Sequence, residues 1–149
     1  MKAYTDIEQS KKLAEILPIE SANMRYGYIA PYDYSDRMYD GGYDEIPYPK
    51  DFLIKNPNFS ANEYDAELPC WSFTALFGVM PQINDWITPH GHKNDKLSQF
   101  EPKLCKIWEH SIIPSYKVTY GNGLSTDIYD NPVDAAFEMV LKLHELGLL

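Results

Sequence analysis

Large and small or polar side chains alternate along two short segments near the C-terminus. In both, every second position carries a large or β-branched residue: Tyr116, Val118 and Tyr120, then Leu124, Thr126 and Ile128. The segment between them, Gly121-Asn122-Gly123, contains an Asn-Gly pair, which supplies the positive φ angles of tight hairpin turns. The pattern predicts a β-hairpin with one buried face.

A nearly all-round apolar segment follows the hairpin and predicts a helix from about Pro132 to Leu146. Asn131 can accept from the free N–H groups of the first turn, and proline is favoured at the first helical position. Gly147 can take the left-handed conformation that ends a helix. The charged residues fall on one narrow stripe: Asp134, Glu138, Lys142 and Glu145. A helix with so little polar surface is buried on more than one side, so we expect it to be central.

Two further helices are expected. Thr5-Asp6-Ile7-Glu8 has a capping-box pattern and opens an amphipathic segment that Pro18 ends. Apolar residues between Pro69 and Pro81, including Cys70 and Trp71, predict a core helix.

The segment from Pro81 to Pro114 is harder to read, but two stretches in it could each supply a strand: Ile83–Thr88 around Trp86, and Leu104–Ile113 around Trp108. Both tryptophans would then be core residues. We predict one α+β domain over residues 1–149, with about three helices on a small antiparallel sheet of two to four strands. The C-terminal hairpin leads into the central C-terminal helix.

Five short blocks stand out along the chain: Met1-Lys2-Ala3-Tyr4-Thr5-Asp6, Glu8-Gln9-Ser10-Lys11-Lys12-Leu13-Ala14, Leu68-Pro69-Cys70-Trp71-Ser72, Asp130-Asn131-Pro132-Val133-Asp134-Ala135 and Lys142-Leu143-His144-Glu145-Leu146. In these blocks the chain resembles a family of small uncharacterised proteins of gut Bacteroidales, often associated with mobile elements or prophages. The resemblance implies a shared scaffold and origin, and no assigned activity. The blocks coincide with the three predicted helices.

Charge and cysteine content narrow the classes of protein to consider. The net charge of −9 argues against direct nucleic-acid binding, which depends on Lys and Arg replacing counterions along the phosphate backbone. No apolar run suits a membrane span, and the N-terminus reads as a charged helix where a signal peptide would need an apolar stretch. Two cysteines fit reduced, buried thiols. We expect a cytoplasmic protein.

Residues 26–49 have the most unusual composition. Seven tyrosines lie there: Tyr26, Tyr28, Tyr32, Tyr34, Tyr39, Tyr43 and Tyr48. Five acids accompany them: Asp33, Asp36, Asp40, Asp44 and Glu45. No helical or sustained alternating period is evident, which predicts a long loop, and long loops are often functional. Tyrosine is enriched in binding surfaces because a large rigid ring carries a polar hydroxyl.

This loop has three interpretations. It could recognise a protein partner, a sugar or a cationic group that stacks on the rings beside carboxylates. The rings could instead fold back over a small core. An acidic, tyrosine-rich surface could also imitate nucleic-acid phosphate and occupy a basic site on a partner.

Catalytic patterns are sparse. His90, His92 and Asp95 offer two imidazoles and a carboxylate to a metal, but no further ligands follow at a recognisable spacing. Cys105 with His110 would need a close base and solvent access to form a reactive thiolate, so a small buried thiol is the simpler interpretation.

Three other residue types with catalytic potential are interpreted structurally. Cys70 lies in an apolar run that raises a thiol pKa. His144 is expected to be a hydrogen-bonded core histidine, and Ser72 lacks the glycines of a nucleophile elbow.

The leading hypothesis is a nonenzymatic cytoplasmic interaction protein without a cofactor. It would engage an unknown protein partner through the tyrosine-rich loop, and the named contact residues are the seven tyrosines with Asp36, Asp40 and Asp44. The alternatives are a metal-assisted hydrolase using His90, His92 and Asp95, and a small-ligand protein for a sugar or cationic group. The sequence does not indicate an oligomeric state.

Overall fold

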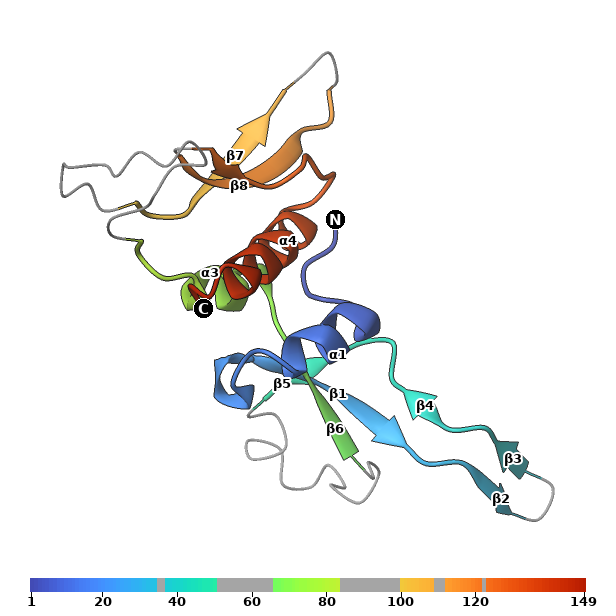
Figure 1. The fold of residues 1–149 in the computed structure, drawn as a ribbon. Coiled ribbons are helices and arrows are strands. Elements are labelled where there is room, and N and C mark those ends of the chain that lie inside the picture. The colour runs from blue at the N-terminus through green and yellow to red at the C-terminus, as the bar shows by residue number, and fades with distance from the viewer. Residues whose placement is uncertain (35–36, 51–65, 84–99, 109–111, 122) are drawn as a thin grey trace. The chain divides into compact units, whose positions relative to one another are not determined.

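The computed structural model describes residues 1–34, 37–50, 66–83, 100–108, 112–121 and 123–149 (Figure 1). Their fold is α+β, as predicted, with helices and small antiparallel sheets. Contacts divide the chain into a C-terminal unit, Met1–Ala3 with Phe73–Leu149, and an N-terminal unit, Tyr4–Ser72. A single domain over residues 1–149 stays a prediction.

The sheet of the C-terminal unit has the order β7-β8-β9, with β7 at Lys103–Ile107, β8 at Ser115–Gly121 and β9 at Leu124–Ser125. The inward positions of β8 are Tyr116, Val118 and Tyr120, as the alternation predicts. The predicted strand around residues 104–113 is realised in β7, which pairs with β8 and extends the hairpin. Ile83 forms a bridge with Phe100.

The second half of the hairpin departs from the predicted alternation. The Thr126 N–H donates to the Val118 carbonyl at 2.9 Å, but it is Tyr129, one residue beyond Ile128, that pairs with Tyr116. The extra residue shifts the register by one, and a one-residue shift turns side chains to the opposite face. Ile128 is accordingly 51% exposed, so its predicted inward position is wrong.

Helix α4 spans Pro132–Glu145 and agrees closely with the prediction. At its start, the side chain of Asn131 accepts from the Asp134 N–H at 2.9 Å. At its end, Gly147 has φ 70°, and the Leu148 N–H donates to Leu143 in a Schellman ending. The helix contacts both β8 and α3, so its predicted central position in this unit is confirmed.

The predicted helix between Pro69 and Pro81 is shorter than expected. Helix α3 spans Phe73–Val79, whereas Cys70 ends strand β6, Ala66–Cys70, and Trp71 follows that strand. Sheet pairing explains the difference, because β6 pairs residue by residue with β1. The apolar run therefore divides between a buried strand and a helix.

Two side chains predicted to be buried are exposed. Trp108 follows the last residue of β7 and is 59% exposed, with the Lys106 ammonium 4.8 Å from its ring centroid. The other predicted core tryptophan, Trp86, lies outside the described residues. His144 occupies the exposed side of the last turn of α4, so it is not a core histidine.

The N-terminal unit is built on strand β1, Met24–Ile29. Strand β6 pairs along one edge of β1, and the short strands β4, Gly42–Tyr43, and β5, Tyr48–Pro49, share its other edge. Helix α1, Ile7–Ala14, contacts β6, and a 3-10 turn follows at Ile19–Ser21. Among the described residues of this unit, the buried hydrophobic ones are Leu13, Leu17, Ala22, Tyr26, Leu68, Cys70 and Trp71.

The capping box of α1 lies one residue later than predicted. Asp6 is the N-cap and accepts from the Gln9 N–H at 2.9 Å, while the Gln9 side chain accepts from the Asp6 N–H at 3.2 Å. Thr5 is not the cap because its hydroxyl is buried and bonded elsewhere.

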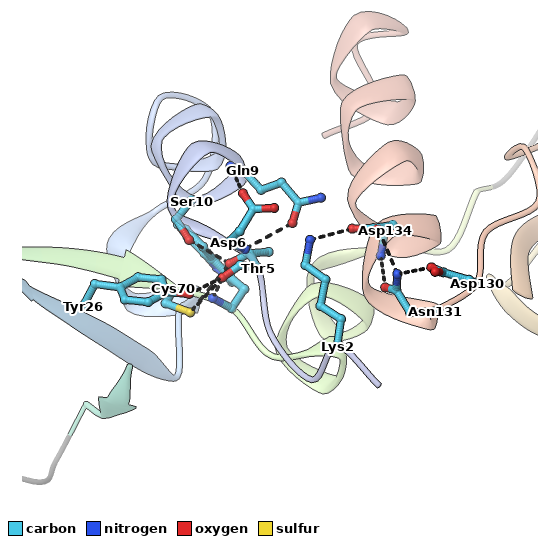
Figure 2. A network of polar contacts seen from close by, with 11 residues as sticks. Lys2, Thr5, Asp6, Gln9, Ser10, Tyr26, Cys70, Asp130, Asn131 and Asp134 are labelled. Atoms are coloured by element: carbon cyan, nitrogen blue, oxygen red, sulfur yellow. Dashed lines mark hydrogen bonds and ion pairs between the residues drawn. The ribbon is translucent and has the colours of Figure 1, made fainter. Parts of the chain in front are cut away.

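The start of α4 generates a test of its cap. The Asn131 side-chain amide donates to the carboxylates of both Asp130 and Asp134 at 2.7 Å, and Lys2 reaches Asp134 at 2.8 Å (Figure 2). Aspartate usually caps as well as asparagine. Here, Asn131→Asp would place a third carboxylate beside two others, so we expect a loss of about 1–3 kcal/mol in the free energy of unfolding.

Urea unfolding at low and high salt measures the effect of that substitution. The loss should shrink at high salt because screening weakens the repulsion. Asn131→Ser, which keeps a capping oxygen without charge, is the control and should cost less. An Asp variant as stable as the parent protein would contradict this description of the cap.

Candidate functional site

The tyrosine-rich segment forms strands where a long loop was predicted. Besides β1, β4 and β5, it contains β2, Tyr32–Tyr34, and β3, Arg37–Tyr39, which pair with each other. Tyr28 is opposite Tyr43 in the β1–β4 ladder, and Tyr32 is opposite Tyr39 in the β2–β3 ladder. The same number of residues separates the two ladders on each side, so the register does not change between them. In Figure 1, β2 and β3 continue the line of β1 and β4 as a narrow two-stranded arm.

A proline and a glycine interrupt this arm between its two ladders. Pro31 has no N–H to donate to a ladder. In the facing segment, Gly41 has φ 81°, and a Cβ at this position would lie 2.8 Å from Pro31 Cδ. Only glycine fits such a conformation and approach. The interruption hides the alternation in the sequence, although Tyr26 and Tyr28 before Pro31, and Tyr32 and Tyr34 after it, occupy alternate positions.

Four of the seven tyrosines belong to the body of the N-terminal unit. Tyr26 is buried, and its hydroxyl donates to the Thr5 carbonyl. Tyr28 and Tyr43 are half-buried with ring centroids 4.9 Å apart. Tyr48 is also half-buried and donates to a Glu67 carboxylate oxygen.

Two tyrosines are available at the surface. Tyr32 is 48% exposed and Tyr39 is 37% exposed, and their rings stack with centroids 5.4 Å apart and an interplanar angle of 28°. Tyr34 lies in β2. Among the named acids, Asp40 is exposed and Asp44 is half-buried, whereas Asp36 lies outside the described residues.

The two paired strands and the residues that flank them, 31–34 and 37–40, form a surface that we call the β2–β3 ribbon. It also presents two residues that the sequence did not single out as contacts, Met38, which is 77% exposed, and the exposed Asp33. Six residues line an open concavity of about 280 Å³ on the ribbon: Pro31, Tyr32, Asp33, Met38, Tyr39 and Asp40. An open, shallow hollow of mixed apolar and acidic character suits a protruding side chain of another molecule better than an enclosed substrate.

A second cluster of polar groups is buried around Thr5 (Figure 2). The Thr5 N–H donates to the Trp71 carbonyl at 2.9 Å, and the Thr5 hydroxyl accepts from the Trp71 N–H at 3.1 Å. That hydroxyl lies 2.8 Å from the Ser10 hydroxyl. The Thr5 carbonyl accepts from the Tyr26 hydroxyl at 2.8 Å and from the Cys70 thiol at 3.5 Å.

The chemistry of this cluster is structural. Burial raises the pKa of the Cys70 thiol, and the hydrogen bonds from Thr5, Ser10 and Tyr26 offset only part of that effect. The thiol is fully buried, so it is neither ionised nor accessible to a substrate at neutral pH.

The remaining catalytic candidates form no site among the described residues. Ser72 is half-buried and exchanges hydrogen bonds with the side chain of Asn23. Cys105 is half-buried in β7 rather than fully buried. His90, His92, Asp95 and His110 lie outside the described residues. Within the described ranges, no three His, Cys, Asp or Glu side chains are grouped so as to hold a metal ion.

No family model, no curated protein and no solved structure matches the chain. In the part of the chain that the structure describes, none of the helices combines the length and apolar character needed to cross a membrane. The β2–β3 ribbon is therefore a candidate site on the strength of its own geometry and exposure.

Removing one hydroxyl tests the Thr5 cluster. Thr5→Val keeps the shape of the side chain but leaves the buried Trp71 N–H without its acceptor. We expect a loss of about 1–3 kcal/mol in the free energy of unfolding, measured by urea titration. Thr74→Val, at an exposed position of α3, is the control and should change stability little. Equal effects at both positions would contradict the role of the cluster.

Alkaline pH provides a second test of buried groups. Burial raises the pKa of the Tyr26 and Tyr120 hydroxyls above their ordinary value of 10.0, and both donate to backbone carbonyls. Above about pH 10 the unfolded chain releases these protons while the folded chain keeps them, so the free energy of unfolding falls as pH rises. Urea titrations across that range measure the decline. Tyr26→Phe should make it shallower, and an unchanged slope would contradict the assignment of Tyr26.

Proposed function

We propose that this chain is a nonenzymatic cytoplasmic interaction protein that binds a partner protein through the β2–β3 ribbon. The observation that carries the proposal is the exposure of Tyr32, Met38 and Tyr39 on a ribbon that pairs with no other strand among the described residues. Exposing large side chains of this kind to water is unfavourable, and they are typical anchors of protein interfaces.

The stacked pair makes the ribbon suited to recognition. Tyr32 and Tyr39 are directly opposed across the strands, and each ring restricts the other. A preorganised aromatic pair loses little conformational entropy on binding. Met38, in β3, is directly opposite Asp33 in β2. Its flexible, polarisable side chain can adapt to an irregular surface.

The outer edges of β2 and β3 support the same proposal. A two-stranded ribbon is marginally stable by itself in water, and its unpaired edges can accept an added strand. Within the described residues of the N-terminal unit, β1 is flanked along both edges, whereas β2 and β3 have only each other. An added strand would therefore stabilise the ribbon.

Site-specific photocrosslinking in cells of the source organism tests this function. A photoreactive phenylalanine analogue replaces Met38, and the same analogue at Ile46 is the matched control because Ile46 is 73% exposed outside the ribbon. We expect a discrete protein adduct from position 38 that untagged parent protein competes away. The analogue at position 46 should give little of this adduct.

The stacked tyrosines provide the loss-of-function arm. Combining Tyr32→Ser and Tyr39→Ser should lower the adduct yield on the order of tenfold or more, since truncating an aromatic anchor costs ~2 kcal/mol or more. Circular dichroism and urea titration check that this variant folds. Equal adducts from positions 38 and 46, or a yield that survives loss of both rings, would refute the proposal.

A further inference from the structure

The two faces of the β2–β3 ribbon differ in chemistry. Side chains alternate between faces along a strand, so the directly opposed Tyr32 and Tyr39 share one face. Positions 31, 33, 38 and 40 fall on the other face, where Asp33 is directly opposite Met38. The second face thus combines two exposed carboxylates with a proline ring and an exposed thioether side chain.

The positions of these groups form two crossed diagonals. In an antiparallel ribbon, Asp40 follows Met38 by two residues and is the diagonal neighbour of Asp33, which places their Cβ atoms less than about 7–8 Å apart. Pro31 and Met38 occupy the other diagonal. All four residues line the open concavity of about 280 Å³, together with Tyr32 and Tyr39.

We infer that this face binds an arginine side chain on an extended segment of the partner protein, an inference that rests on the proposed function. The guanidinium group would lie between Asp33 and Asp40, and its methylene stem would cover Met38 and Pro31. Charge complementarity favours this occupant, because both carboxylates are exposed and the chain as a whole carries −9.

Arginine fits this face better than lysine does. Its planar fork has five donors and can bridge two carboxylates, whereas an ammonium group is a compact point charge with a tighter hydration shell. Its stem can also bury apolar surface while the charged head stays near water. The apolar diagonal would distinguish this site from a simple accumulation of negative charge.

Peptide titration of the full-length protein, followed by amide NMR, tests the inference. The probes are otherwise identical Gly/Ser peptides that carry a single arginine, lysine or citrulline. We expect the shifts to concentrate in the described residues of 31–40, with the arginine peptide binding roughly fivefold more tightly than the lysine peptide. The citrulline peptide should not bind measurably.

A matched pair of charge variants gives the decisive control. Asp33→Asn with Asp40→Asn should abolish arginine binding, whereas Glu15→Gln with Glu20→Gln removes the same charge from exposed positions outside the ribbon and should not. If the two double variants lose arginine binding equally, the attraction is nonspecific and the inference is overturned. Equal affinity for arginine and lysine, or shifts outside the ribbon, would also overturn it.

Further outcomes distinguish a small cation from a protein segment as the occupant, and failure of the arginine site from failure of the proposed function. If N-acetylarginine amide binds as tightly as the arginine peptide, the site takes a small cation and the protein-segment inference fails. If the partner protein identified by crosslinking still binds, in a pull-down, the protein that keeps Met38 and carries Asp33→Asn with Asp40→Asn, the arginine site alone is overturned. If the parent protein binds the arginine peptide but competes away no adduct at position 38, the proposed function is overturned instead.

Discussion

The N-terminal unit depends on the hydrogen bonds of Thr5, a buried residue that lies just before the first helix. Its N–H, carbonyl and hydroxyl all have partners, and those partners come from α1, β1 and the end of β6. A buried polar group without a partner costs free energy, so these segments keep their positions only together. The raised pKa of the Cys70 thiol serves the same arrangement, because a neutral thiol can donate to the Thr5 carbonyl and a thiolate cannot.

The ribbon follows from how this anchored sheet ends. The Tyr26 hydroxyl links β1 to the Thr5 carbonyl, and β6 pairs with β1 from Met24 to Tyr28. Beyond Pro31, β2 and β3 keep the same hairpin register, but among the described residues no third strand pairs with them. The tyrosines therefore have different roles along one strand direction. Tyrosines within the flanked part of the sheet stabilise the fold, whereas Tyr32 and Tyr39, beyond the break, are exposed at the surface. This division explains how a single tyrosine-rich segment contributes to both stability and the candidate site.

In the C-terminal unit, the charged stripe of α4 compensates for an irregular hairpin. Where the register shifts after β9, the Glu138 carboxylate accepts from the Asp127 N–H at 2.9 Å and Lys142 donates to the Ser125 carbonyl at 2.8 Å. The two side chains also pair with each other at 3.1 Å, as their spacing predicts. A stripe that looks like a solvated helix face in the sequence thus supplies hydrogen bonds to backbone groups beside the register shift.

What the sequence determined by itself are the features whose causes lie within a few residues of one another. Asn131 and Pro132 begin α4, Gly147 ends it, and alternation marks β8, because caps and strand faces depend on local geometry. Tertiary structure decided the rest. Cys70 is in a strand because β1 lies beside it, the capping box begins at Asp6 because Thr5 is already bonded, and Trp108 is exposed because it follows an edge strand. Tyr26 and Tyr32 have similar surroundings in the sequence, and only the layers packed around each determine that one is core and the other surface.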